Sequence, residues 1–334
     1  MLTPELPEPL TPLLGWIASA EPKPVLHPQS WGNHLPRISI VTPSFNQAEF
    51  IESTIRSVLL QGYPNLNYIV IDGGSSDHTV EILQHYHDHL SYWVSEPDRG
   101  QSHAINKGMA IADGDVCGWL CSDDLFATGA LIKIGDYLAR HPECEWLAGD
   151  GEFIHSETNE VERFEAGIRS SEALLEYWRY GAPGYFLPQP STFWSRVLWD
   201  HVEGLREDNH LAMDYELWLR FEELTKLHRL KDVLSMSQLH NDCKTQSRRS
   251  EQCQEMMRCA YEASLRRGQP RYRLSLKLLS HWLLRWRLAR SRRHLASAEF
   301  GEAAAELVKA IKAPLQVWHE PSRMAALEWN AGSQ

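Results

Sequence analysis

The 334-residue sequence lacks the features that mark several specialised classes of protein. No apolar run approaches the roughly 20 residues that a membrane-spanning helix needs. The first residues, MLTPELPEPLTPLLGW, lack the basic start and apolar block of a secretory signal, and the chain has no low-complexity tract. These absences predict a globular protein of the cytoplasm, and the chain is long enough to bury a sizeable core.

Paired cysteines are also missing. None of the six cysteines stands in a CxxC arrangement, and a large cytoplasmic domain does not need disulfides for its stability. Cys117 and Cys121 could face the same way on one strand, but we interpret them as small buried side chains rather than as a metal site. The sequence therefore predicts free thiols.

Acidic residues are absent from one long stretch of a chain that is acidic overall. The net charge is −11, yet ten of the 33 Lys and Arg residues lie between Arg266 and Arg293, where no Asp or Glu occurs. The stretch YRLSLKLLSHWLLRWRLARSRR mixes leucine, tryptophan and arginine at helical spacing. It predicts a basic helix packed on the acidic body or lying on the inner face of an anionic membrane, and we do not expect nucleic-acid binding.

Hydrophobic runs alternate with amphipathic segments from residue 37 to about residue 150. ISIV, at 38–41, and NYIVI, at 67–71, are short runs rich in β-branched residues, and QAEFIESTIRSVLLQ between them has helical spacing. The alternation predicts an α/β fold with a mostly parallel central sheet covered by helices on both faces. Ligands bind outside the carboxyl ends of such strands, so the residues that follow each strand should converge.

The alternation ends after residue 150. GDGEFIHSETNEVERF predicts a pair of strands joined by a polar turn, PQPSTFWSR an extended segment entering a turn, and MDYELWLRFEEL a helix. We predict a lead-in over residues 1–36, an α/β domain over residues 37–245 and a helical C-terminal region over residues 246–334.

Two adjacent carboxylates, Asp123 and Asp124, follow the predicted strand DVCGWL. At a buried strand end they repel each other unless something neutralises them. Mg²⁺ or Mn²⁺ could do so and bridge the pair to substrate phosphates. Alternatively, the pair is exposed and caps the helix that follows.

A glycine-rich turn, Asp72-Gly73-Gly74-Ser75, follows the second predicted strand. Its glycines let backbone amides approach a ligand, and Asp72 could accept hydrogen bonds from a base or ribose. A dinucleotide-binding protein would carry GxGxxG after the first strand, but TPSFNQAEF stands there without a glycine. This disfavours a nicotinamide-dependent dehydrogenase.

Five motifs in order over residues 37–245 resemble the motif set of family 2 glycosyltransferases. They are TPSFNQAEFIESTIRSVLLQ, NYIVIDGGSSDHT, SEPDRGQSHAINKG, GWLCSDD and MDYELWLR. The resemblance implies a GT-A fold, a nucleotide-sugar sandwich that uses a DXD-type metal site and inverts the anomeric centre. It also implies transfer of a hexosyl-type sugar from a nucleoside diphosphate sugar to a saccharide or lipid-linked acceptor, as in polysaccharide assembly for the cell envelope.

The same resemblance implies roles for individual residues. Asp214 would be the general base, with Glu216 as a second candidate, and Asp124 and Asp123 would hold Mn²⁺ or Mg²⁺. The segment QLHNDCKT resembles a flap in which His240 and a cation, here Lys244, approach the metal or diphosphate. The residues implied to bind the nucleotide sugar are Thr42, Pro43, Ser44, Asp72, Gly73, Ser75, Asp123 and Gln189.

This sequence departs from the family pattern in two of these motifs. Gln238 stands where the family often has arginine, which leaves less positive charge in the flap. In SEPDRGQSHAINKG, His103 stands where relatives often carry Asp or another small polar residue. Arg99 and Lys107 of that motif are candidate donor contacts or solvated surface charges, and the helix that starts there would favour a diphosphate at its N-terminus.

Some alternatives remain at this point. Trp194, near Gln189, could face a sugar or belong to the core. A non-catalytic nucleotide-sugar-binding protein would keep the fold, although Asp123, Asp124 and Asp214 are all present. A sugar nucleotidyltransferase would release pyrophosphate, whereas a glycosyltransferase releases a nucleoside diphosphate.

Overall fold

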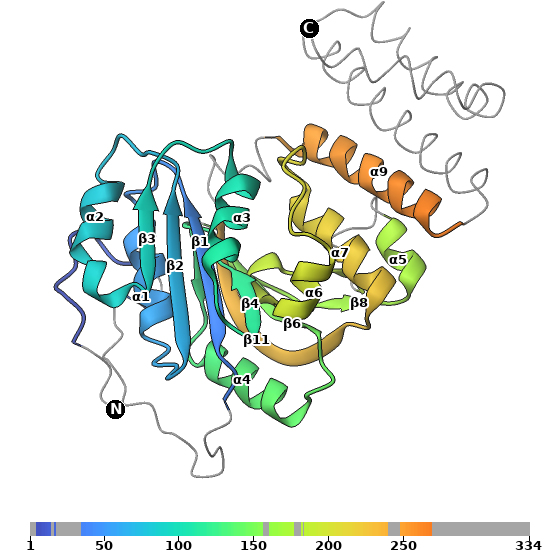
Figure 1. The fold of residues 1–334 in the computed structure, drawn as a ribbon, viewed down its shortest axis with the longest axis horizontal. Helices are drawn as coiled ribbons and strands as arrows, with labels where there is room; N and C mark the ends of the chain where they lie inside the picture. Colours follow the sequence, from blue (N-terminus) through green and yellow to red (C-terminus); the bar gives the residue numbers. More distant parts are fainter. Residues whose placement is uncertain are drawn as a thin grey trace, which may run out of the picture.

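A computed structural model describes residues 5–14, 17, 35–155, 160–176, 182, 184–239 and 248–268. A nine-stranded sheet in the order β3-β2-β1-β4-β10-β6-β11-β5, with β7 paired to β6, forms the centre of the molecule, and helices pack around it (Figure 1). The strands are β1 (Ile38–Ser44), β2 (Leu66–Asp72), β3 (Tyr92–Ser95), β4 (Val116–Trp119), β5 (Asp124–Phe126), β6 (Trp146–His155), β7 (Val161–Phe164), β8 (Gly167–Ile168), β9 (Tyr185–Phe186), β10 (Thr192–Ser195) and β11 (His228–Leu239). The helices are α1 (Ile51–Leu59), α2 (Thr79–His85), α3 (Gln101–Ile111), α4 (Ala130–Arg140), α5 (Ser171–Leu175), α6 (Arg196–His201), α7 (Met213–Leu224) and α9 (Arg249–Arg266), with 3-10 turns η2 (His87–His89) and η4 (Gln189–Ser191).

The first half of the sheet is parallel, as the alternation of strands and helices predicts. β1 pairs in parallel with both β2 and β4, and β2 pairs in parallel with β3. Every residue of β1 is buried, because helices cover both faces of the sheet at this point. The predicted α/β fold class is therefore confirmed.

The second half of the sheet is mixed. β10 is antiparallel to β4 and to β6, and so joins the two halves. β11 runs parallel to β6 and antiparallel to β5. β6 and β7 form the predicted antiparallel pair, and the turn between them, at 156–159, lies outside the described residues. The segment PQPSTFWSR, predicted as extended chain, supplies η4 and β10.

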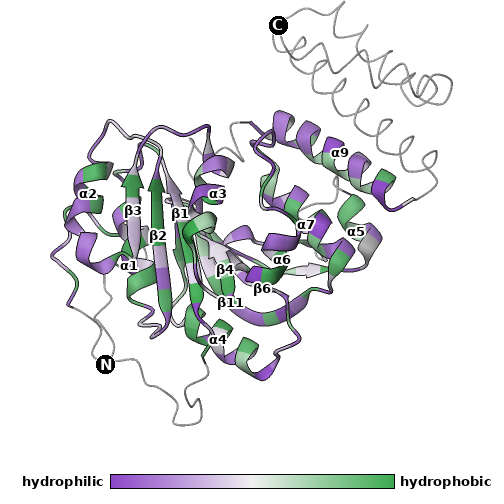
Figure 2. Cartoon of the chain, in the orientation of Figure 1, coloured by the Kyte–Doolittle hydropathy of each residue, from purple (hydrophilic) through white to green (hydrophobic). Residues whose placement is uncertain are grey.

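Two hydrophobic clusters lie on opposite faces of the sheet. On one face, α3, α7 and α9 pack with Trp119, Trp146, Trp194 and Trp218, all fully buried. On the other face, α1, α2 and α4 pack on alternate residues of β1 and β2. Figure 2 shows hydrophobic residues along the central strands and hydrophilic ones on outer helices such as α9. Trp194 is thus a core residue.

The C-terminal part of the chain is described only up to residue 268. Within it, α9 packs against α7 through Met256, Cys259, Ala260 and Ala263. The basic stretch predicted to lie on the body or on a membrane begins near the end of α9 and falls almost entirely outside the described residues. None of the helices in the described ranges combines the length and the hydrophobicity needed to cross a bilayer.

Candidate functional site

A cavity of about 660 Å³ opens at the carboxyl ends of β1 and β4. The strand order runs backward along the chain from β3 to β1 and then jumps to β4, so the loops after β1 and β4 diverge and leave a crevice between them. The structure thus brings together segments that are far apart in the sequence. The predicted site residues that line the cavity are Pro43, Ser44, Gly73, Asp123, Asp124, Gln189 and Asp214.

The turn between β4 and β5 holds the predicted carboxylate pair. The Asp124 amide donates to the Cys121 carbonyl oxygen at 3.0 Å, which closes the turn. From α1, the Thr54 hydroxyl lies 2.8 Å from the Ser122 carbonyl oxygen and 2.9 Å from that of Asp124. These buried contacts fix the backbone, so both carboxylates are presented at the cavity wall.

The carboxylate pair forms a cluster that suits a divalent cation. Ligand atoms of Cys121, Asp123 and Asp124 all lie within 4.8 Å of one another. Burial, together with the nearby charge of Asp123, raises the pKa of Asp124 well above its usual range. Two carboxylates held this close favour a cation that offsets their repulsion, and their oxygen atoms are the ligands that Mg²⁺ and Mn²⁺ prefer. The alternative role of the pair, an exposed cap of the following helix, is not consistent with the burial of Asp124.

Gln189 lies beside the acidic cluster. Its Nε2 donates to the Trp119 carbonyl oxygen at 2.9 Å, and the Cys121 thiol donates to its Oε1 at 3.6 Å. The side-chain nitrogen Nε2 of Gln101 donates to the Cys121 sulfur at 3.1 Å. These bonds tie η4 and the start of α3 to the turn after β4.

Asp214 lies in the first turn of α7 and faces the same cavity. Burial raises its pKa to about 6, although hydrogen bonds from the amides of Tyr215 and of Asp214 itself act in the opposite direction. A carboxylate with such a pKa is largely ionised at neutral pH and is a stronger base than an exposed aspartate. The arrangement suits proton abstraction from a bound hydroxyl.

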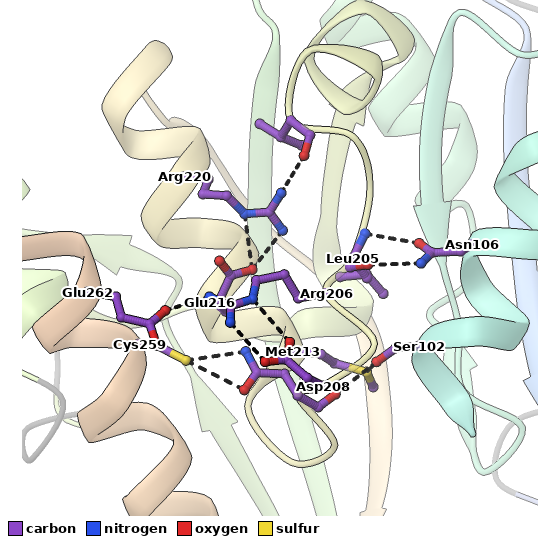
Figure 3. Close-up of polar contacts among 12 residues, drawn as sticks. Ser102, Asn106, Leu205, Arg206, Asp208, Met213, Glu216, Arg220, Cys259 and Glu262 are labelled. Atoms are coloured by element: carbon purple, nitrogen blue, oxygen red, sulfur yellow. Dashed lines mark hydrogen bonds and ion pairs between the residues drawn. The ribbon is translucent and has the colours of Figure 1, made fainter. Parts of the chain in front are cut away.

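Glu216, the second candidate base, lies outside the cavity lining. Its Oε2 accepts hydrogen bonds from Arg220 Nε at 3.0 Å and Nη2 at 2.7 Å, and both side chains are largely buried (Figure 3). Arg220 also donates to the Val202 carbonyl oxygen at 2.6 Å. Glu216 therefore belongs to a structural ion pair within α7.

Asp72 is fully buried and does not line the cavity. Its Oδ2 accepts hydrogen bonds from the amides of Gly74 and Ser75, at 3.1 and 2.9 Å, and from the Ser95 hydroxyl at 2.6 Å. The loop folds so tightly that a Cβ on Gly73 would lie 2.8 Å from Asp98 Oδ2. Asp72 thus shapes the glycine-rich loop, and its contact with a nucleobase stays a prediction.

The structure does not bring four other predicted donor contacts to the cavity wall. The hydroxyls of Thr42 and Tyr68 lie 3.1 Å apart in the core, and Ser75 accepts from the Asn46 amide at 2.7 Å. Arg99 pairs with Glu207, at 2.7 Å between Nη2 and Oε2, and Lys107 pairs with Glu96. In this structure Arg99 and Lys107 are therefore surface charges in ion pairs, which is the alternative that the sequence analysis gave for them. His240 and Lys244 lie outside the described residues.

His103 stabilises the turn that precedes α3. The Arg99 amide donates to His103 Nδ1 at 3.1 Å, and the Gly100 amide donates to Asp98 Oδ1 at 2.7 Å. Gly100 adopts φ 114°, which other residues rarely reach. His103 and Asp98 therefore hold the turn that places Gly100 and Gln101 at the cavity.

Sequence reasoning missed several cavity residues. Cys121 was expected to be a small core residue but stands in the acidic cluster, and its place beside two aspartates was a usable signal. Asp98, by contrast, follows β3 and lies at the cavity, as expected for residues at the carboxyl ends of the strands. His210 and Gln252 line the cavity as well, and Gln252 comes from α9. No local pattern marks Gln252, because the packing of α9 on α7 brings it there.

Comparison with known families finds a match for part of the first half of the chain and the residues just after it. Residues 39–185 match the family model Glycosyl transferase family 2. An uncharacterised glycosyltransferase of Mycobacterium tuberculosis is 42% identical over 93 residues, which are 28% of this chain and 36% of the relative. The putative teichuronic acid biosynthesis glycosyltransferase TuaG of Bacillus subtilis is 37% identical over 104 residues, or 30% of this chain and 41% of the relative. These matches thus span well under half the length of either relative.

Solved structures share the fold at low sequence identity. Staphylococcus aureus TarS 1–349 in complex with UDP-GlcNAc superposes with a TM-score of 0.56 and 16% identity, over 75% of this chain and 72% of that one. The mannosyltransferase PcManGT of Pyrobaculum calidifontis, in complex with GDP-Man and Mn²⁺, gives a TM-score of 0.54 and 17% identity, over 88% of this chain and 81% of that one. The likeness confirms the GT-A fold.

Proposed function

The chain belongs to glycosyl transferase family 2, and we propose that it transfers a sugar from a nucleoside diphosphate sugar to a saccharide or lipid-linked acceptor, with inversion at the anomeric carbon. One observation carries the proposal. Asp214, with its raised pKa, and the pair Asp123 and Asp124 line a single cavity at the point where the strand order reverses. A base and a metal-binding pair in one crevice are the two parts that this chemistry requires.

Asp214 acts as the general base in this proposal. It accepts the proton of the acceptor hydroxyl as the bond between that oxygen and the anomeric carbon forms. The bond between the anomeric carbon and the diphosphate oxygen breaks at the same time, and the nucleoside diphosphate leaves with the electron pair. Attack from the face opposite the leaving group inverts the configuration and needs no covalent intermediate.

Asp123 and Asp124 hold Mn²⁺ or Mg²⁺, with Asp124 as the main ligand. When bound, the cation offsets the negative charge that builds up on the departing diphosphate. No Lys or Arg lines the cavity within the described part of the chain. The first turn of α3, which contains no acidic residue, begins at the cavity and adds a favourable dipole for the diphosphate.

A donor screen tests the function. UDP-N-acetylglucosamine and GDP-mannose, the nucleotide sugars bound in the two structural neighbours, are incubated with the protein, Mn²⁺ or Mg²⁺ and a panel of saccharide and lipid-linked acceptors, alongside other UDP- and GDP-sugars. We expect release of a nucleoside diphosphate with at least one donor. Release of pyrophosphate would instead indicate a nucleotidyltransferase, and no release from any pair would favour a binding protein.

The metal site is testable without substrates, through Cys121. Because its thiol lies within 4.8 Å of the carboxylate ligand atoms, a bound cation should shield it from alkylation by iodoacetamide. We expect Mn²⁺, at about ten times its dissociation constant, to slow labelling of Cys121 about tenfold, as measured by peptide mass spectrometry. Cys253 on α9, also partly buried, is the internal control. Equal labelling of Cys121 with and without Mn²⁺ would argue against a cation at this cluster.

A further inference from the structure

One face of α9 contacts the segment that leads into α7. This segment, residues 205–212, is named the pre-α7 segment. Gln252 Nε2 donates to the Leu211 carbonyl oxygen at 3.1 Å, Arg258 bonds to the Asn209 side chain, and Glu262 pairs with Arg206 (Figure 3 shows the last pair). Together with Glu255, these α9 residues recur every three or four positions and so share one side of the helix.

Glu255, from the same face, makes the densest contact. Its Oε2 accepts three hydrogen bonds from the consecutive amides of His210, Leu211 and Ala212, at 3.0, 2.8 and 3.1 Å. Successive amides that point at one oxygen form a concave anion site, and bonds to a charged acceptor are stronger than neutral ones. Glu255 thus fixes three peptide units directly before α7.

The start of α7 has little other support of this kind. Its N-cap residue is Ala212, which has no side-chain acceptor, whereas Ser, Thr, Asp and Asn are the preferred residues at this position. Asp214 takes the amides of Tyr215 and of itself. The backbone amides around the start of this helix are therefore bound by two carboxylates. Glu255 from α9 accepts those of residues 210–212, and Asp214 from α7 accepts its own and that of Tyr215.

The other side of the pre-α7 segment is held by α3. The Ser102 hydroxyl donates to the Asn209 carbonyl oxygen at 3.0 Å, and the Asn106 side chain makes two 2.9 Å bonds with the backbone of Leu205 (Figure 3). With α3 and α9 on opposite sides, the segment has little freedom to shift. Its last residue is followed, two positions later, by the carboxylate that faces the cavity.

We propose that Glu255 is a positioning residue for the general base: its carboxylate holds the amides of residues 210–212 and thereby fixes Asp214 against the acceptor hydroxyl. This inference rests on the proposed function, because it takes Asp214 as the base. Glu255 itself does not line the cavity, so its effect passes through the backbone that leads into α7. Displacement of a catalytic group by about 1 Å can cost about a hundredfold in rate.

Three variants test the proposal in the full chain: Glu255→Gln, Glu255→Ala and Glu251→Gln. Turnover is measured with the donor and acceptor found in the screen above, and binding of UDP or GDP with Mn²⁺ by calorimetry. We expect kcat to fall about tenfold in Glu255→Gln, which keeps a neutral acceptor oxygen, and about a hundredfold in Glu255→Ala. Nucleotide affinity should stay within about twofold, because α9 does not hold the glycine-rich loop.

Glu251→Gln is the matched control. Glu251 precedes Glu255 by one turn on α9 and is exposed, and its hydrogen bonds go to Arg248 at the surface. The same change of charge there should leave kcat within about twofold. If Glu255→Ala does not fold, Glu255→Gln alone decides.

The outcomes separate this inference from the proposed function. A kcat for Glu255→Gln within twofold of the wild-type value, while Asp214→Asn is inactive, would overturn the positioning role and leave the function intact. An equal loss of nucleotide affinity and kcat would also overturn it, since the segment would then support the donor site. Normal turnover in Asp214→Asn would remove the base role and the positioning inference with it, while sugar transfer itself would stand. A fall in kcat alone supports the inference.

Discussion

Asp214→Asn is expected to lower kcat by about 10²–10⁴-fold while nucleotide binding stays unchanged. The amide cannot accept a proton from the acceptor hydroxyl, but it has nearly the same size and can still accept the amides of Asp214 and Tyr215. Turnover assays and calorimetry with UDP or GDP would measure the two effects separately. A kcat close to that of the wild type would rule out Asp214 as the base.

The same carboxylate predicts the pH dependence of the reaction. Because the pKa of Asp214 is raised to about 6, kcat/KM should be flat above pH 7 and fall as the pH drops through about 6. An exposed aspartate would lose its charge only near pH 4. A profile of kcat/KM between pH 5 and 8 checks this, and a profile without a fall near pH 6 would contradict it.

The raised pKa also has a consequence for stability. In the unfolded chain Asp214 regains the usual pKa of 3.8, so the folded state disfavours the ionised form. The resulting loss of stability is absent below pH 3.8 and complete above pH 6, where it amounts to at most about 3 kcal/mol. Asp214→Asn should therefore raise the melting temperature at pH 8, with a smaller gain at pH 5.

Asp124→Asn is expected to remove metal-dependent activity, with a fall in kcat/KM of about a hundredfold or more. The variant loses the charge that binds the cation, while the buried turn around Ser122 keeps its backbone bonds to Thr54. It also loses a buried charge and the repulsion between Asp123 and Asp124, the two causes that raise the pKa of Asp124. Activity should therefore fall while the metal-free protein becomes more stable, as measured by Mn²⁺ titration and thermal unfolding.

Asp150→Asn is the matched control for this substitution. Burial alone would raise the pKa of Asp150, but its bonds to Arg163 and Arg229 outweigh burial and hold the pKa below its usual range. The stability that these bonds supply is present at neutral pH and is lost as the pH falls below the usual pKa. Asp150→Asn should thus lower stability and leave the Mn²⁺ titration unchanged. If Asp124→Asn were destabilising in the same way, Asp124 would be a structural residue.

Much of the parallel half of the fold is predictable from local patterns. The runs ISIV and NYIVI are hydrophobic on both faces, and α1 between them has a single apolar side, so each segment carries its own burial pattern. The rule for ligand sites in open α/β sheets then predicts that Ser44, Gly73 and Asp124 lie close together, and all three line the cavity.

Contacts between distant segments could not be predicted in this way. Arg99 looked like a donor contact, but Glu207, 108 residues later, holds it in an ion pair. The Asp72 carboxylate accepts hydrogen bonds from Ser75 of its own loop and from Ser95 of the neighbouring strand. A charged side chain near a strand end binds the nearest partner, and the identity of that partner is set by packing that no local pattern encodes.

The sequence by itself determined the order of strands and helices in the parallel half of the sheet, the family, and the acidic residues at the cavity, because these depend on short-range periodicity and on motifs. Only the tertiary structure decided that β10 joins the two halves of the sheet, and that α9 contributes Gln252 to the cavity and Glu255 to the start of α7. Strand pairing and helix docking depend on contacts between segments that are distant in the sequence. Each element, once its local structure has formed, still has apolar surface to bury and backbone groups to pair, and these requirements select its neighbours.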